Sequence, residues 1–371
     1  MVGGAFFVSG PSLPVSPLPY GVPKPLFPSE IAQNRFPLAQ NLLYEFPQGF
    51  STFRRAAAMD LFDHPDNPIP EGAVSGFVRT RDGKSIRYGR FPARVSPARG
   101  TVTILQGRAE FIEKYFESIE TLRDRGFCVV AFDWRGQGGS DRLINKPQRG
   151  YIDSFEDYLR DLDAVLEEVT FPDGPAPHFC LAHSTGCAVA LLGAERLRTR
   201  FERMVLSSPL VGFGSSGFGQ ALLCPVALGL TFLGFGEFRV PGTPKRRTHI
   251  PFKGNVLTSD ETRYERFENV LDAQPELVTG APTIAWINAA CQAMRHFARH
   301  DYAPSVSLPI LMVVSGADTV VNTQATEELA SRMRAAGYIE IPGARHELMM
   351  EANRFREQFW AAFDAFVPGS V

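Results

Sequence analysis

Residues 179–192 constrain the fold of this chain more than any other stretch. A short apolar run ends at Ser184, and a helix-like apolar run follows almost directly, over residues 187–192. Small residues, Ala182 and Gly186, stand two positions before and two positions after the serine. This order predicts a strand, a sharp turn with the serine at its apex, and a helix. It matches the nucleophile elbow G-x-S-x-G with alanine in the first glycine position.

A serine at a strand-to-helix turn also has a simpler interpretation. It can cap the first turn of the helix, because its side-chain oxygen accepts hydrogen bonds from the free N–H groups there. The two interpretations make different demands on the rest of the chain. A nucleophilic serine needs a histidine as base, an acid that orients the histidine, and N–H groups that stabilise an oxyanion.

The composition is that of a large globular protein. The 371-residue chain is 44% hydrophobic with a net charge of −2, which permits one large domain with an insertion or two domains. This charge gives no indication of nucleic-acid binding. The cysteines have no zinc-site spacing, and a reaction at a nucleophilic serine needs neither a metal nor a cofactor, so we expect none. We predict that all five cysteines are reduced core residues in a reducing compartment, the cytoplasm. They are Cys128, Cys180, Cys187, Cys224 and Cys291.

Apolar strand patterns alternate with helical patterns along most of the chain. After a hairpin over residues 73–91, this alternation predicts an α/β fold with a mostly parallel central sheet and helices on both faces. The predicted strands cover residues 101–105, 127–132, 178–182, 204–207, 309–314 and 338–341. The predicted helices cover residues 110–125, 155–169, 323–334 and 351–366.

The interval 211–305 interrupts this alternation with Gly- and Pro-rich runs and helical stretches at 260–271 and 282–295. We predict a helical cap inserted over the carboxyl edge of the sheet, where ligands of such folds bind. The first residues are rich in proline and lack the pattern of a signal peptide. The expected organisation is an N-terminal extension (1–58), a first core part (59–210), the cap (211–305) and a second core part (306–371).

The partners that a nucleophilic serine needs are present in the expected chain order. Asp318 follows the predicted strand 309–314, and His346 follows the predicted strand 338–341. Both therefore fall at the carboxyl ends of strands, the edge where Ser184 also lies, in the order Ser, Asp, His that this elbow requires. The N–H groups of Thr185 and Arg108 are the predicted oxyanion hole. His183, although beside the serine, is predicted to point elsewhere.

The glycine-rich residues 135–140 present a competing motif. They begin like G-x-G-x-x-G, but Asp141 occupies the position of the last glycine, and no acidic ribose ligand follows at the expected distance. We therefore predict a structural loop near the rim of the active site and no nucleotide binding.

Three stretches carry a resemblance to a known family. Residues 105–115 (LQGRAEFIEKY), 133–140 and 183–186 resemble the α/β-hydrolase superfamily, in the branch of lysophospholipases and monoacylglycerol lipases that is also grouped with serine aminopeptidases. Residues 257–260 and 280–283 with Trp286 resemble the cap of the lysophospholipase L2 type. The family's nucleophile, acid and base then fall on Ser184, Asp318 and His346. Gln106 and Ala182 depart from the family pattern without removing a needed N–H group.

The resemblance implies a serine hydrolase that cleaves lipid carboxylic esters, lysophospholipids or monoacylglycerols, through an acyl-enzyme. The alternatives are a peptidase or amidase of the same fold, and a non-catalytic lipid-binding protein. The basic segment Lys245-Arg246-Arg247 either contacts a membrane surface peripherally or forms a solvated loop. Seven apolar cap residues either cover the acyl chain or pack against the sheet: Leu222, Leu223, Val226, Leu228, Leu230, Phe232 and Phe235.

Overall fold

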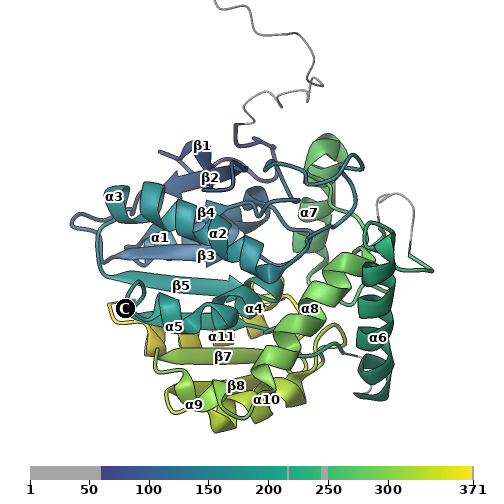
Figure 1. Cartoon of the computed structure of the whole chain (residues 1–371). Coiled ribbons are helices and arrows are strands. Elements are labelled where there is room, and N and C mark those ends of the chain that lie inside the picture. Colours follow the sequence, from purple (N-terminus) through teal and green to yellow (C-terminus); the bar gives the residue numbers. More distant parts are fainter. Residues whose placement is uncertain (1–59, 215–216, 244–249, 370–371) are drawn as a thin grey trace, which may run out of the picture. The chain divides into compact units, whose positions relative to one another are not determined.

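The computed structural model describes residues 60–214, 217–243 and 250–369, and its central feature is an eight-stranded sheet (Figure 1). The strand order is β1-β2-β4-β3-β5-β6-β7-β8. The β1–β2 and β2–β4 pairs are antiparallel, and all the others are parallel. The predicted α/β fold is thereby confirmed. The strands are β1 (Val74–Arg79), β2 (Ser85–Phe91), β3 (Thr101–Leu105), β4 (Cys128–Phe132), β5 (His178–His183), β6 (Arg203–Ser207), β7 (Ile310–Ser315) and β8 (Ala336–Ile341).

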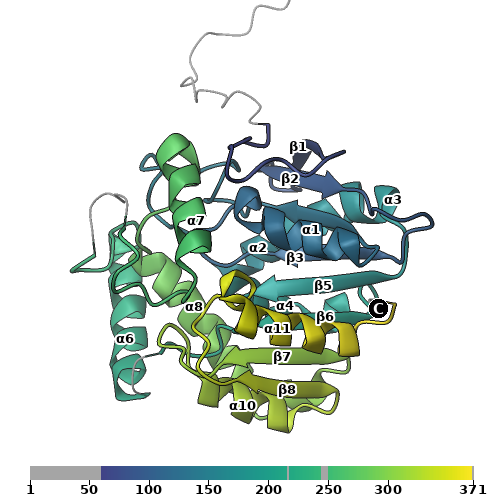
Figure 2. The same ribbon diagram turned by 180° about the vertical axis from the view of Figure 1, so that it is seen from behind.

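Each face of the sheet has its own hydrophobic core, because successive side chains of a strand point to opposite faces. In β4, Val130 and Phe132 belong to one core, and Val129 and Ala131 belong to the other. The first core lies under α2 (Phe155–Val165), α4 (Thr185–Leu192) and α10 (Thr323–Arg332). The second lies under α1 (Phe116–Asp124) and α11 (Asn353–Phe366). These two helices lie in front of the sheet in Figure 2, which shows the molecule from the side opposite to Figure 1.

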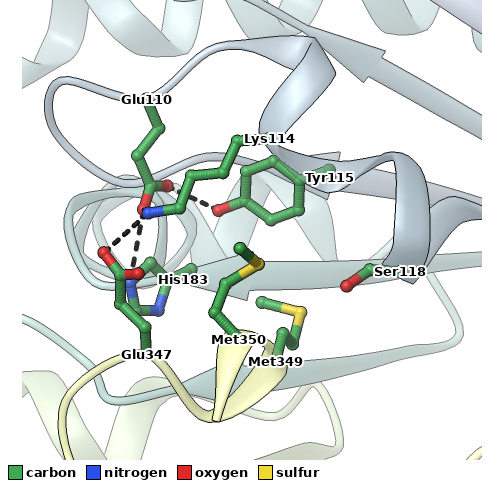
Figure 3. A pocket seen from close by; sticks show the side chains of 8 residues that line it. All are labelled: Glu110, Lys114, Tyr115, Ser118, His183, Glu347, Met349 and Met350. Atoms are coloured by element: carbon green, nitrogen blue, oxygen red, sulfur yellow. Dashed lines mark hydrogen bonds and ion pairs between the residues drawn. The ribbon is translucent and has the colours of Figure 1, made fainter. Parts of the chain in front are cut away.

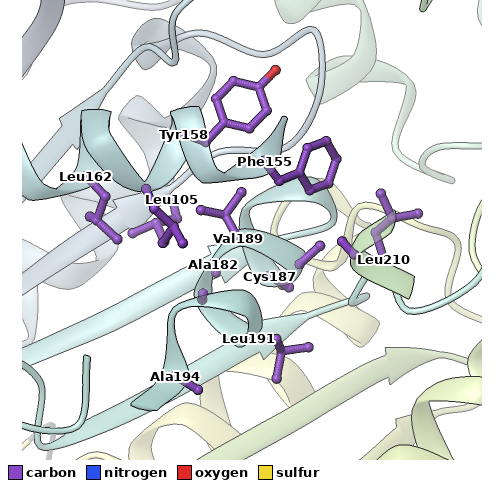
Figure 4. Close-up of a cluster of buried hydrophobic side chains, with 14 of the residues drawn as sticks. Leu105, Phe155, Tyr158, Leu162, Ala182, Cys187, Val189, Leu191, Ala194 and Leu210 are labelled. Carbon is purple, nitrogen blue, oxygen red and sulfur yellow. The ribbon is translucent and has the colours of Figure 1, made fainter. Parts of the chain in front are cut away.

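The first core is densely filled around the helix that follows Ser184. Figure 4 shows Phe155 and Leu162 of α2 and Val189 of α4 gathered between the two helices. All three side chains are almost fully excluded from solvent. The start of α4 is therefore held firmly against the sheet, which fixes the position of the serine before it.

Most of the interval predicted as a cap forms helices beyond the carboxyl ends of the central parallel strands (Figure 1), whereas its last helix leads into the amino end of β7. Helix α8 packs against α4 as well as α6, and its Ala290 and Cys291 belong to the first core. The cap therefore shares a core with the sheet. Its helices are α6 (Gly217–Leu230), the π-helix η3 (Thr231–Phe235), α7 (Glu261–Ala273), the 3₁₀ turn η4 (Pro275–Leu277), α8 (Ile284–Phe297) and α9 (Tyr302–Ser305).

Short helical segments complete the described part of the chain. They are η1 (Ile112–Tyr115), η2 (Leu166–Thr170), α3 (Phe171–Asp173), α5 (Ala194–Leu197) and η5 (Leu348–Met350). Among the helices described here, none has the length and apolar character needed to cross a bilayer. The predicted N-terminal extension (1–58) and the basic segment Lys245-Arg246-Arg247 lie outside the described residues.

Most of the apolar side chains on α6 and η3 do not pack against the sheet. Leu223 and Leu230 pack partly against the first core. In contrast, Leu222 is 63% exposed and Phe232 is 89% exposed. The predicted alternative of packing against the sheet therefore holds only for the side of α6 that carries Leu223 and Leu230.

The prediction of five reduced cysteines is wrong. Cys224 of α6 and Cys291 of α8 form a disulfide, whereas Cys128, Cys180 and Cys187 are free thiols. The paired residues are 67 positions apart, and their meeting depends on how α6 packs on α8, which spacing alone does not reveal. Disulfides persist mainly in oxidising compartments. The prediction of a reducing compartment therefore loses the support that it drew from unpaired thiols.

Candidate active site

Ser184 sits at the apex of a strained turn between β5 and α4. Its backbone angles, φ of 49° and ψ of −110°, lie in a region that residues other than glycine rarely adopt. The turn is tight because a Cβ on Gly186 would lie 2.2 Å from the carbonyl oxygen of Leu105 in β3. Glycine is therefore required two residues after the serine. Ala182, two residues before it, fits in a fully buried position.

The structure brings Ser184, His346 and Asp318 together from three loops at the carboxyl edge of the sheet. The His346 Nε2 atom lies 3.1 Å from Ser184 Oγ, and its Nδ1 atom lies 2.7 Å from Asp318 Oδ2. The other carboxylate oxygen, Oδ1, accepts the N–H groups of Val320 at 2.8 Å and Val321 at 3.1 Å. These bonds fix the carboxylate, which in turn fixes the imidazole.

The Asp318 carboxylate is held in its charged form. Burial by itself would raise its pKa, but the hydrogen bond and charge of His346 and the two backbone N–H groups outweigh burial, and the pKa is lowered. An ionised Asp318 accepts the Nδ1 proton of His346, so Nε2 of the neutral imidazole carries the lone pair. In this tautomer, which we assign from the hydrogen bonds, Nε2 can accept the hydroxyl proton of Ser184.

Of the two N–H groups predicted for the oxyanion hole, that of Thr185 directly follows the serine in the chain, and that of Arg108 belongs to a residue that lines the same cavity as Ser184. Thr185 begins α4, where an N–H group has no acceptor within the helix. Within the described residues, the N–H of Arg108 likewise has no acceptor. Gln137 holds the loop on both sides of Arg108, because its Oε1 accepts the Ala109 N–H at 2.8 Å and its Nε2 donates to the Gly107 carbonyl at 3.1 Å. Gln137 belongs to the glycine-rich loop 135–140, and this bracing role is not evident from its sequence.

A buried ion cluster connects the Arg108 loop to the histidine loop (Figure 3). The Lys114 Nζ atom lies 2.7 Å from Glu110 Oε1 and 2.6 Å from Oε1 of Glu347, the residue after the histidine. The second oxygen of Glu110 accepts the Gly107 N–H and, at 2.5 Å, the hydroxyl of Tyr115. The cluster thus couples the loop that carries Arg108 to the loop that carries His346.

His183 extends this cluster to the histidine itself. It makes no hydrogen bond to Ser184, yet its ring centroid lies 4.9 Å from that of His346. Its Nε2 atom lies 3.6 Å from Glu110 Oε1. Burial lowers the pKa of His183 to about 4, although the Glu110 charge opposes the shift. His183 is therefore neutral at pH 7 and places no positive charge beside the ring of His346.

Three ligand-type residues of the cluster lie close enough together to suggest a metal site. Side-chain atoms of Glu110, His183 and Glu347 all lie within 4.8 Å of one another. The Lys114 ammonium, however, is bonded to both carboxylates. A cation bound there would have to displace this ammonium, so the donor set fits a structural ion cluster better than a metal site.

A cavity of about 560 Å³ opens onto the serine and histidine, within the usual size range of small-molecule sites. Its walls come from the core loops and from the cap. Most of the wall residues contributed by the cap and its flanks are apolar: Leu210, Phe213, Ile250, Leu257, Phe267, Pro282, Trp286 and Ile287.

A serine lies on a strained strand-to-helix turn at the carboxyl edge of this sheet and is hydrogen-bonded to a histidine, which is itself hydrogen-bonded to an aspartate. This arrangement defines the chain as an α/β-hydrolase. Its residues 96–353 match the family described as serine aminopeptidase, S33. Because this match spans well over half of the sequence, the chain belongs to that family.

Curated relatives and solved structures agree with this assignment. The chain is 29% identical to lysophospholipase L2 of Escherichia coli (strain K12), over 77% of this chain and 87% of the relative. It is 28% identical to a probable lysophospholipase L2 of Haemophilus influenzae, over 73% of this chain and 85% of the relative. A soluble variant of monoglyceride lipase from Saccharomyces cerevisiae superposes with a TM-score of 0.63 at 18% identity, covering 80% of this chain and 97% of that one. That likeness concerns the fold alone. The predicted resemblance to lysophospholipases and monoacylglycerol lipases is confirmed.

Proposed function

We propose that this protein is a carboxylic ester hydrolase that cleaves monoacyl lipids, lysophospholipids or monoacylglycerols, through an acyl-enzyme on Ser184. The observation that carries the proposal is the pair of hydrogen bonds from the His346 ring to Ser184 Oγ (3.1 Å) and Asp318 Oδ2 (2.7 Å). This arrangement faces an apolar cavity of about 560 Å³. The likeness to lysophospholipase L2 supports a lipid ester as the substrate.

In the proposed reaction, Ser184 Oγ attacks the ester carbonyl carbon while His346 Nε2 takes its proton. The N–H groups of Thr185 and Arg108 stabilise the oxyanion, a contribution of about 3 kcal/mol per donor in other serine hydrolases. Asp318 stabilises the imidazolium, which then protonates the leaving alcohol. Water, activated by the same imidazole, attacks the acyl-enzyme carbonyl and releases the fatty acid. Transfer to another alcohol in place of water would use the same groups.

The proposed location of the acyl chain is the apolar wall of the cap. Leu210, Phe213 and Ile287 line the same cavity as Ser184, and burying each methylene of an acyl chain there contributes about 0.8 kcal/mol. The opposite side of the ester, with its leaving alcohol, then faces the polar residues of the cavity.

An aminopeptidase is the second function to consider, because the family description names one. Such an enzyme needs a carboxylate free to bind the substrate's terminal ammonium group. Among the described residues, the carboxylates that line the cavity belong to Glu110 and Glu347, and Lys114 already bonds both of them. This pairing favours the ester substrate.

We further propose that the exposed apolar side of α6 and η3 contacts a lipid surface peripherally. Phe232 is 89% exposed, Leu233 is 67% exposed, and Phe238 nearby is 54% exposed. Such neighbouring exposed apolar side chains are typical of interaction surfaces.

The test of this contact is vesicle binding. Binding of the double variant Phe232→Glu/Leu233→Glu to phosphatidylethanolamine–phosphatidylglycerol vesicles should fall well below that of the wild type. Hydrolysis of short soluble esters should be unchanged. Ile339→Glu, at an exposed apolar residue of β8, is the matched control, and equal vesicle binding by all three proteins would contradict the proposal.

The test of the enzymatic proposal compares wild type with Ser184→Ala on a panel of substrates. The panel holds a long-chain monoacylglycerol, lysophosphatidylcholine, lysophosphatidylethanolamine, a short p-nitrophenyl ester and an aminoacyl-naphthylamide. We expect long-chain ester turnover that is lost in the variant, and labelling of Ser184 by a fluorophosphonate. Preference for the amide would establish the peptidase, and absence of both turnover and labelling would establish a non-catalytic lipid-binding protein.

A further inference from the structure

The catalytic cavity contains one cationic side chain without a counter-ion among the described residues. Two cations, Arg108 and Lys114, line it. Lys114 is neutralised by two carboxylates, but Arg108 makes no ion pair with a described carboxylate. Its Nη1 atom donates to the Gly280 carbonyl at 2.7 Å, and its Cζ atom lies 5.7 Å from the centroid of the Trp286 ring.

The Arg108 side chain has unused capacity to bind an anion. A guanidinium has five N–H donors, and the Gly280 carbonyl takes one of them. Glu110 is a nearby carboxylate, but it is already bonded to Lys114, Tyr115 and a backbone N–H. Burial lowers the pKa of Arg108, yet arginine remains charged in proteins. An anion that bound here would offset the cost of burying this charge.

The reach of Arg108 matches the geometry of a phosphate-bearing monoacyl lipid. Six bonds separate the backbone nitrogen of Arg108, the proposed oxyanion donor, from its Cζ atom. Six bonds also separate the ester carbonyl carbon from phosphorus in a glycerophospholipid acylated at C1. Since three extended bonds span about 3.6 Å, each span is about 7 Å when fully extended. A substrate whose oxyanion meets the Arg108 N–H can therefore bring its phosphate to the guanidinium of the same residue.

We propose that Arg108 is a specificity-determining residue whose guanidinium binds the head-group phosphate of a lysophospholipid, so that the site prefers phosphate-bearing monoacyl lipids to neutral monoacylglycerols. This inference rests on the proposed ester hydrolysis at Ser184 and deepens it. A guanidinium forms paired, charge-assisted hydrogen bonds to phosphate oxygens, which a neutral glycerol head group does not offer.

A purely structural role for Arg108 makes a different prediction. Gly280 and Trp286 belong to the cap, so Arg108 also connects the oxyanion loop to the cap. Loss of that connection would reduce turnover of every substrate by a similar factor. Binding of the phosphate predicts instead a selective loss for phosphate-bearing substrates. The ratio of kcat/KM values for the two lipid classes separates the two roles.

The experiment measures kcat/KM for lysophosphatidylglycerol, for a monoacylglycerol with the same acyl chain and for a short p-nitrophenyl ester. The variants are Arg108→Met and the conservative Arg108→Lys. In Arg108→Met, the lysophospholipid-to-monoacylglycerol ratio should fall about 10- to 100-fold, the range for loss of charge-assisted hydrogen bonds. Arg108→Lys should recover part of that ratio. Arg149→Met is the matched control, because Arg149 Nη1 donates to the cap carbonyl of Glu237 at 2.6 Å in a solvent-exposed hydrogen bond, and Arg149 does not line the cavity. Its ratio should stay at the wild-type value.

Each outcome supports or overturns the inference. An unchanged ratio in Arg108→Met, with both lipids slowed equally, would overturn it while leaving the ester hydrolase intact. Turnover of the p-nitrophenyl ester alone, in wild type, would instead refute the proposed lipid substrate. Inorganic phosphate distinguishes a lipid head group from free phosphate as the anion that Arg108 binds. Suppose that phosphate inhibits monoacylglycerol hydrolysis by the wild type but not by Arg108→Met, and that the lysophospholipid-to-monoacylglycerol ratio is the same in both proteins. This result would assign the site to free phosphate and overturn the head-group assignment. Equal fluorophosphonate labelling of the variants establishes that they fold.

Discussion

The ammonium group of Lys114 lies 2.6 Å from a carboxylate oxygen of Glu347, the residue that follows His346. The two partners are 233 positions apart in the chain. Together with Glu110, this ion pair holds the Arg108 loop and the histidine loop in one buried unit. Both the stability of the fold and the alignment of the hydrolytic groups should therefore depend on Lys114.

Replacing Lys114 with methionine should cost about 3–5 kcal/mol of unfolding free energy, because it leaves two buried carboxylates without a counter-charge. The value of kcat for a short p-nitrophenyl ester should fall, since the two loops lose their common anchor. Urea unfolding and steady-state kinetics measure the two effects. Lys253→Met, at an exposed residue of the cap, is the matched control and should change stability by less than about 0.5 kcal/mol. Equal stability of the two variants would show that the ion cluster carries no structural role.

Replacing Gly186 with alanine should destabilise the elbow and lower activity. The new Cβ would lie 2.2 Å from the Leu105 carbonyl oxygen, a backbone atom that cannot move aside cheaply. Overpacking of this kind costs about 1–3 kcal/mol or more. Gly229→Ala is the control, because that helical glycine of α6 has no atom within 4 Å of the added methyl group, and it should be neutral or slightly stabilising. The comparison uses urea midpoints and fluorophosphonate labelling rates, and a fully active Gly186→Ala would refute the steric argument.

The sequence was sufficient for the features that local patterns determine. Apolar runs of strand length located the core strands, and the serine turn then required an acid and a histidine after two later strands. The structure brings Ser184, Asp318 and His346 into hydrogen-bonding distance, as that reasoning anticipated. The three residues meet because a parallel sheet brings the carboxyl ends of its strands to one edge, and their catalytic roles stay a prediction.

The features that the sequence did not reveal all depend on contacts between distant segments. Gln137 stands in a glycine-rich loop, and nothing in its local pattern indicates that it braces the Arg108 loop. Glu110 and Lys114 stand in a helix-like stretch where charges normally face solvent, yet both are buried against Glu347. Only the packing of the whole chain makes these groups neighbours.

The Cys224–Cys291 disulfide should leave three titratable thiols in the unreduced, denatured protein, out of five cysteines. Closing a loop of 67 residues constrains the unfolded chain, and the entropic estimate of the stabilisation is about 4 kcal/mol. Adding a reductant should therefore lower the urea midpoint of the wild type. It should not change that of Cys224→Ala/Cys291→Ala, and Cys128→Ser should respond as the wild type does. Five titratable thiols would contradict the disulfide.

Acid should destabilise the fold partly through His183. Burial lowers its pKa to about 4 in the folded chain, compared with about 6.5 when the chain is unfolded. Below pH 6.5 the unfolded chain gains a proton that the folded chain does not accept, so the unfolding free energy decreases as the pH falls. The decrease continues to about pH 4 and then levels off. Its full size is about 3 kcal/mol, from a difference of roughly 2.5 pKa units.

In His183→Gln this contribution disappears, because glutamine does not titrate. The unfolding free energy, measured in urea at several pH values, should fall less steeply between pH 6.5 and pH 4 than in the wild type, and the two curves should run parallel above pH 7. His300→Gln, at an exposed position, controls for loss of a histidine that is open to solvent and should keep the wild-type slope. Parallel curves for wild type and His183→Gln across the whole range would mean that His183 accepts a proton as readily in the folded chain as in the unfolded one. In that case, its charge beside His346 would begin to oppose formation of the imidazolium near pH 6.5, and ester hydrolysis would decline with the same midpoint.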